Sequence, residues 1–136
     1  MEWKEKEAKC GDIVRVKVTF YHHYGIFTEN DTIIQFGLPD NVNRPASEVF
    51  VLETDVYEFL RGGQLEVMEP SGAKKKKMRP PKEIVRLARE RIGQGGYDIL
   101  HNNCEHFVNE CAFGEHHSSF VSGVREKLRQ KLNKKT

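Results

Sequence analysis

The stretch that decides the fold is His101-Asn102-Asn103-Cys104-Glu105-His106-Phe107-Val108-Asn109-Glu110-Cys111. It predicts a helix entered through a polar turn, because asparagine is a favoured N-cap and Glu105 places a negative charge in the first turn. Gly114 is the expected C-terminal stop. The apolar side chains recur at a spacing typical of one buried helical face: Cys104, Phe107, Val108 and Cys111.

Cys104 falls at the start of this predicted helix. Unpaired backbone N–H groups there lower the pKa of a thiol and can also hold an oxyanion. A cysteine in this position is either a nucleophile or a packed core residue. Cys111 is expected to pack, and Cys10 to be an incidental small residue before the first strand. Three cysteines are an odd number, which fits free thiols in a reducing compartment better than a disulfide framework.

The segments before the cysteine helix read mainly as strands. Alternation predicts a half-buried strand over residues 14–20, with one face made by Val14, Val16, Val18 and Phe20. Further strands are expected at 21–27, 32–36, 49–52, 64–68 and 97–100. A polar turn at 29–31 joins the second strand to the third. His23 and Gln35 then fall on neighbouring antiparallel strands, where they can face each other.

The other segments divide the chain into three parts. Residues 1–9 are expected to form a mobile lead, 10–117 one domain, and 118–136 a basic amphipathic helix. Within the domain, loops are expected at 38–45 and 69–80, and a turn or two of helix at 55–60. A longer helix is expected to begin at Pro80-Pro81, with an apolar stripe made by Ile84, Leu87, Ala88 and Ile92. The predicted class is α+β, with an antiparallel sheet packed against helices.

Two motifs carry a resemblance to a known family. Asn103-Cys104-Glu105-His106-Phe107-Val108 resembles the signature of the lecithin:retinol acyltransferase-like family, which includes the small phospholipase A/acyltransferases. Upstream, Gly11-Asp12-Ile13-Val14 opens a strand that leads to a second match, His23-Tyr24-Gly25-Ile26-Phe27. The resemblance covers most of residues 10–114, with both motifs in the family's order. It implies a thiol enzyme with a circularly permuted papain-like (NlpC-type) fold.

The same resemblance implies a catalytic set. Cys104 would be the nucleophile, His23 the base and then the acid, and Gln35 the group that orients the imidazole. The small phospholipase A/acyltransferases have histidine at the third position, whereas Gln35 accepts a hydrogen bond but carries no charge. His22 competes with His23 for the role of base. Adjacent strand residues point to opposite faces, so only one can meet the thiol, and the motif match favours His23.

These residues predict a ping-pong acyltransferase or acyl hydrolase with a Cys104 thioester, acting on an ester that is expected to be a lipid. A cysteine peptidase or amidase of the same superfamily and a non-catalytic binding module are the alternatives. No cofactor is implied. The main alternative to thiol catalysis is a zinc site, for which the candidate ligands are His101, Cys104, His106, Cys111, His116 and His117. It is disfavoured because there is no Cys-x-x-Cys, and because Cys104 and His106 cannot share one helical face.

The composition indicates the type of protein, its cellular location and its expected partners. The 136 residues are 31% charged and 38% hydrophobic, which is typical of one soluble domain. No apolar run approaches a membrane span, and the N-terminus does not resemble a signal peptide. A cytoplasmic location is expected, with peripheral membrane contact as a second option. Lys74–Lys77 and the C-terminal helix are either solvated surfaces or contacts for anionic headgroups. Nucleic acid is not an expected partner, because no stacking aromatics accompany the lysines.

Overall fold

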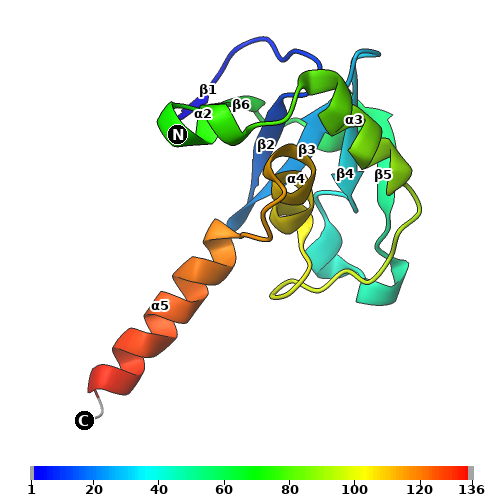
Figure 1. Cartoon of the computed structure of the whole chain (residues 1–136). Helices are drawn as coiled ribbons and strands as arrows, with labels where there is room; N and C mark the ends of the chain where they lie inside the picture. The colour runs from blue at the N-terminus through cyan, green and yellow to red at the C-terminus, as the bar shows by residue number, and fades with distance from the viewer. Residues whose placement is uncertain (1, 135–136) are drawn as a thin grey trace.

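The computed structural model describes residues 2–134 and is built around one six-stranded antiparallel sheet (Figure 1). The strand order is β1-β6-β2-β3-β4-β5. The strands are β1 (Glu2–Lys4), β2 (Ile13–Val18), β3 (Tyr21–Phe27), β4 (Thr32–Phe36), β5 (Val51–Asp55) and β6 (Glu66–Glu69). The helices are α1 (Val56–Leu60), α2 (Gly72–Lys77), α3 (Pro81–Glu90), α4 (Cys104–Phe113) and α5 (Ser119–Lys134), with 3-10 turns at Asn41–Asn43 and Ala46–Glu48. The predicted α+β class is confirmed, while its assignment to the permuted papain-like fold stays a prediction.

The sheet is apolar on both faces, and different helices cover them. One cluster joins the sheet to α3 and α4, and it contains Ile26, Ile34, Phe36, Ile84, Phe107 and Val108. A second cluster joins the other face to α1, and it contains Val14, Val16, Phe27, Ile33, Phe59 and Val67. Strand β3 contributes to both faces because successive side chains alternate. Tyr24 belongs to the α4 side, and His23 packs against Phe59 with ring centroids 5.4 Å apart.

Three expectations about local structure were wrong. Strand β2 ends at Val18, which pairs with Tyr21, so a two-residue turn forms and Phe20 is 92% exposed rather than buried in a strand. Residues 97–100 form no strand, because only an isolated bridge between Asp98 and Asn102 occurs there. The lysine-rich segment contains α2 rather than a loop.

Two contacts explain why α2 is ordered. Lys74 lies 2.7 Å from Glu115 through its ammonium group and 4.2 Å above the ring centre of Phe113. Lysine is also a good helix former, so an exposed lysine run is compatible with a helix once one residue is anchored. The expected loop was inferred from composition alone, which carried no sign of either contact.

The segment expected to be a lead supplies an edge strand to the sheet. Strand β1 pairs with β6, with Trp3 opposite Met68. The Trp3 ring packs edge-on against Tyr24 at 5.7 Å, and the Arg15 guanidinium lies 4.1 Å from the Trp3 ring centre. Among residues 2–134, no helix combines the length and apolar character that crossing a membrane requires.

Gly11 lets the chain pass close to the start of α3. Its φ is +85°, and a Cβ placed there would lie 2.6 Å from the Pro81 Cα. The Gly11 N–H also donates to the Phe27 carbonyl at 2.8 Å, so this turn joins β2, β3 and α3. A side chain at this position would therefore meet backbone that cannot move independently of the core.

We predict that Gly11→Ala lowers the free energy of unfolding by about 2–4 kcal/mol, from positive-φ strain plus the contact with Pro81. Gly62→Ala is the matched control, because its φ is +87° but nothing lies within 4 Å of the added Cβ. The control should lose only about 1 kcal/mol. Urea denaturation of both variants measures the difference. Equal losses would show that close packing on Pro81 does not matter.

Candidate active site

Cys104 is the first residue of α4, and Asn103 is the N-cap. The Asn103 side-chain oxygen accepts hydrogen bonds from the main-chain N–H groups of Glu105 at 2.9 Å and His106 at 3.0 Å. In return, Nδ1 of His106 accepts from the Asn103 N–H at 3.0 Å, which completes a capping box. The predicted asparagine cap is confirmed, as is Gly114 as the left-handed C-cap residue.

This cap changes which backbone donors are available near the thiol. The N–H groups of Glu105 and His106 are engaged by Asn103, and the Phe107 N–H donates to the Asn103 carbonyl at 3.1 Å. Within residues 2–134, no hydrogen bond engages the N–H of Cys104 itself. Of the helix-start donors expected from the sequence, the Cys104 N–H is therefore the open one.

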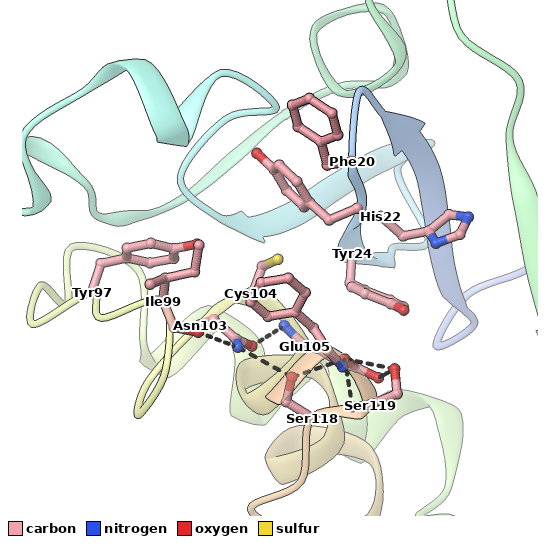
Figure 2. A pocket seen from close by; sticks show the side chains of 12 residues that line it. Phe20, His22, Tyr24, Tyr97, Ile99, Asn103, Cys104, Glu105, Ser118 and Ser119 are labelled. Atoms are coloured by element: carbon pink, nitrogen blue, oxygen red, sulfur yellow. Dashed lines mark hydrogen bonds between the residues drawn. The ribbon is translucent and has the colours of Figure 1, made fainter. Parts of the chain in front are cut away.

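The thiol lies at the base of a pocket with aromatic and apolar walls. Cys104 is buried, and its sulfur points into the space between Tyr97 on one side and His22 and Tyr24 on the other (Figure 2). Further lining residues come from the β2–β3 turn, the loop before α4 and the start of α5: Phe20, Tyr21, Ile99, Ser118, Ser119 and Phe120. The pocket thus joins four separate segments of the chain around one sulfur atom.

His23 and Gln35 face each other as the strand pattern predicts. They are fully buried, and His23 Nε2 lies 2.8 Å from the Gln35 side-chain oxygen. On its other side, the Gln35 amide nitrogen donates to the Thr54 hydroxyl at 2.7 Å, and that hydroxyl donates to the Asp55 carbonyl at 2.9 Å. This chain of donors fixes the orientation of the amide, because the Thr54 oxygen must accept from Gln35.

The orientation of Gln35 in turn sets the tautomer of His23. The Gln35 oxygen can only accept, so Nε2 of His23 carries the hydrogen and Nδ1 of the neutral ring is an acceptor. Within residues 2–134, the His23 Nδ1 is buried and has no hydrogen-bond partner. A buried acceptor without a partner costs about 1–3 kcal/mol. This atom is thus held free at an energetic cost.

The two histidines differ in their position relative to the thiol. His22 is partly exposed and lines the pocket with Cys104, whereas His23 contacts Phe59 on the other face of β3. Within the described residues, no hydrogen bond joins the Cys104 thiol to either ring. The structure therefore brings His23 and Gln35 together and leaves both histidines unbonded to the sulfur.

Burial keeps both members of the expected catalytic pair neutral. Burial raises the pKa of Cys104 to about 12, and the main-chain N–H of Tyr24 opposes part of this rise. Burial also lowers the pKa of His23 to about 4, against the raising effect of its hydrogen bond to Gln35. At neutral pH the resting site therefore holds a thiol and a neutral imidazole rather than a thiolate–imidazolium pair.

Glu105 ties the helix that begins at Cys104 to the start of α5. Its buried carboxylate accepts from the Ser118 hydroxyl at 3.1 Å, the Ser119 N–H at 2.9 Å and the Ser119 hydroxyl at 2.8 Å. The Asn103 amide also donates to the Ser118 hydroxyl at 3.2 Å. The sequence predicted only a favourable charge at a helix terminus, and it did not indicate this network.

The histidines near α4 serve as packing and hydrogen-bonding groups. The rings of His106 and His116 stack at 4.1 Å with an interplanar angle of 6°. His116 bonds Glu110 through Nδ1 and the His101 carbonyl through Nε2, the latter at 2.8 Å. In the part of the chain that the structure describes, no three His, Cys, Asp or Glu side chains are grouped to hold a metal ion.

Sequence reasoning missed several residues of the site. Thr54 fixes Gln35 but lies on a strand with no motif of its own. Tyr97 forms a pocket wall from a segment that was taken for a strand. Ser118 and Ser119, at the start of α5, carried one usable signal, because serine favours helix starts.

The comparisons with known proteins agree with the motifs. Residues 6–117 match the family described as lecithin retinol acyltransferase. The lecithin retinol acyltransferase of Mus musculus is 29% identical over 124 residues, a match that covers 76% of this chain and 54% of the mouse protein. Phospholipase A and acyltransferase 3 of Homo sapiens is 28% identical over 128 residues, covering 87% of this chain and 78% of the human protein. The chain spans about half the length of the lecithin retinol acyltransferases it matches. Because the family match extends over most of its length, the chain belongs to the lecithin retinol acyltransferase family.

Proposed function

We propose that this protein is a thiol-dependent acyltransferase or acyl hydrolase that takes an acyl group from a lipid ester onto Cys104. The observation that carries the proposal is a cysteine at the first position of a capped helix, in an aromatic and apolar pocket, in a chain of this family. The relatives' names describe acyltransferases and phospholipases. The lining also favours an acyl chain, because most of its wall is formed by aromatic rings and Ile99, with the polar groups gathered near Asn103 and Glu105.

His23 is the proposed base, and Nδ1 is the atom that receives the proton. The bond to Gln35 leaves this nitrogen unprotonated, and no other group competes for it among residues 2–134. Burial lowers the pKa of His23 to about 4, which keeps the ring neutral but also makes it a weak base in the free protein. In the free protein the His23 ring packs against Phe59, on the face of β3 opposite to the pocket of Cys104. Proton transfer therefore requires a rearrangement that brings the thiol and Nδ1 together when substrate binds, and the family motif rather than this geometry supports His23 as the base.

The reaction then proceeds by two acyl transfers. As the sulfur attacks the ester carbonyl, the thiol proton passes to His23 Nδ1 and a carbon–sulfur bond forms. The developing oxyanion accepts a hydrogen bond from the main-chain N–H of Cys104, which is the open donor at the helix start. Collapse expels the alcohol, which receives the proton from His23. Water or an acceptor amine or hydroxyl next gives its proton to His23 and attacks the thioester carbonyl. The carbon–sulfur bond then breaks, and His23 returns the proton to the sulfur, which restores the thiol.

Transfer of the acyl group to the enzyme is directly measurable. We predict that incubation with short-chain phosphatidylcholine or with an acyl thioester adds the mass of one acyl group to the intact protein. Cys104→Ala should show no gain, and neither Cys111→Ala nor Cys10→Ala should abolish it. Released fatty acid is assayed in parallel because fast hydrolysis would hide the adduct. Cleavage of peptide amides alone would favour the peptidase alternative, and no adduct with no turnover would favour a binding module.

Replacing each histidine separately identifies the base. We predict that His23→Ala lowers kcat/KM by about a hundredfold or more, because the general base is lost. His22→Ala should change it by less than about tenfold, since its ring forms part of the pocket wall only. Circular dichroism of both variants verifies folding, and His23→Gln is a second variant that retains a buried polar side chain. The reverse order of effects would assign the base to His22.

The pH dependence follows from the two neutral groups. We predict that kcat/KM is nearly constant between about pH 5 and about pH 9 and falls only as His23 becomes protonated near its pKa of about 4. No alkaline limb is expected below the Cys104 pKa of about 12. Initial rates with a soluble ester across this range make the measurement. An acidic limb near neutral pH would contradict a base with this buried environment.

A further inference from the structure

Helix α5 begins at the pocket and then leaves the domain. Glu105 holds its first turn through Ser118 and Ser119, and Val121 is buried beneath it. Beyond this turn the helix extends away from the sheet (Figure 1). Most of α5 is therefore presented outward while its first turn is fixed to the helix that carries the nucleophile.

The outward part of α5 has a continuous apolar stripe. With about 3.6 residues per turn, Phe120, Val124, Leu128 and Leu132 lie along one side of the helix. Leu128 is 56% exposed and Leu132 is 67% exposed, so nothing among residues 2–134 covers the stripe. Large exposed leucines in a row on one helix mark an interaction surface more often than isolated apolar residues do.

Cations border this stripe. Lys127 and Lys131 lie along one edge and Arg125 along the other, by the same helical periodicity. The one acidic residue of α5, Glu126, lies on the opposite side, where it pairs with Arg129 at 3.2 Å. An apolar stripe flanked by lysine and arginine is the arrangement of helices that lie in the headgroup region of a membrane.

Charge complementarity decides which of three partners fits the apolar stripe of α5: a second copy of the helix, a nucleic acid or a lipid surface. A second α5 packed on the stripe would bring like charges together, because no acidic residue borders the stripe to pair with them. A nucleic acid would pair with the cations but leave the leucines in water. An anionic lipid surface accepts the leucines among its acyl chains and the cations among its headgroups. The lysine run of α2 fits such a surface less well, since Lys74 and Lys77 both pair with Glu115.

The stripe is continuous with the mouth of the pocket. Phe120 belongs to both, because it begins the stripe and lines the pocket of Cys104. Phe20 and Ile99 also line this pocket and are 92% and 42% exposed. The exposed apolar side chains around the thiol and those along α5 thus form neighbouring parts of one surface.

We propose that α5, together with Phe20 and Ile99, is a docking surface for an anionic lipid bilayer. Docking holds the pocket mouth against the lipid, and the hydrogen bonds of Glu105 keep α5 in a fixed position relative to Cys104. The lipid source of the substrate rests on the proposed function, whereas the binding of α5 to a bilayer does not require a reactive thiol.

Vesicle cosedimentation of the full chain carrying Cys104→Ala tests the binding. Vesicles of phosphatidylcholine mixed with phosphatidylglycerol should bind the protein. Vesicles of phosphatidylcholine alone should bind it at least about tenfold more weakly. Added salt should weaken the binding. Leu128→Gln/Leu132→Gln should lower it about tenfold or more, while the matched control Leu128→Met/Leu132→Met keeps it. Circular dichroism of the variants verifies that α5 still forms.

Three results would overturn the docking proposal: equal binding to neutral vesicles, undiminished binding of the glutamine variant, or concentration-dependent dimerisation through the leucines instead. Turnover of a soluble short-chain ester by the wild-type chain tests the proposed function separately. Vesicle binding without turnover of any ester would sustain the docking surface and overturn the enzyme. Turnover without vesicle binding would do the opposite.

Discussion

The structure of the site depends on the hydrogen bonds of one side chain, Asn103. Its oxygen satisfies two N–H groups of the first turn of α4, and its nitrogen reaches the Ile99 carbonyl and Ser118. A helix start without such a cap would present those N–H groups to water and fray. Because Cys104 is the next residue, the same bonds that begin the helix also fix the sulfur relative to the loop before it and the helix after the domain.

The polar groups of the candidate site form two separate systems with different tasks. Asn103, Glu105 and Ser118 join α4 to α5 on the side of the pocket. His23, Gln35 and Thr54 cross β3, β4 and β5 and hold one imidazole in one tautomer. Neither system includes a charge on the imidazole or the thiol at rest. At rest the candidate site therefore holds no preformed thiolate–imidazolium pair.

Local patterns in the sequence predicted much of this arrangement. The polar turn between the strands at 21–27 and 32–36 predicted that His23 and Gln35 lie on neighbouring antiparallel strands. The strand pairing places Gln35 opposite Gly25, so His23 is its diagonal neighbour on the same face. Asparagine before an apolar helix indicated the cap. The prediction for Phe20 was wrong because the alternation of apolar residues continues beyond Val18, where the strand ends. The position of the turn depends on the pairing of Val18 with Tyr21, which the alternation does not indicate.

Contacts between distant segments could not be predicted in the same way. Thr54 has no signature, yet it fixes the Gln35 amide from another strand. In the sequence, Glu105 is an ordinary first-turn carboxylate. Only the tertiary structure shows that Ser119, at the start of α5, donates a hydrogen bond to it. In the same way α2 depends on Glu115 and Phe113, which lie far along the chain. Each of these requires the tertiary fold, since the residues alone offer many equivalent partners.

The buried, neutral thiol has a consequence for chemical durability. Peroxide and disulfides react with thiolate, and the fraction of thiolate at neutral pH is very small when the pKa is about 12. A thiol held in this way stays reduced under mild oxidative stress. Enzymes that hold a standing thiolate must instead depend on reductants to restore the sulfur.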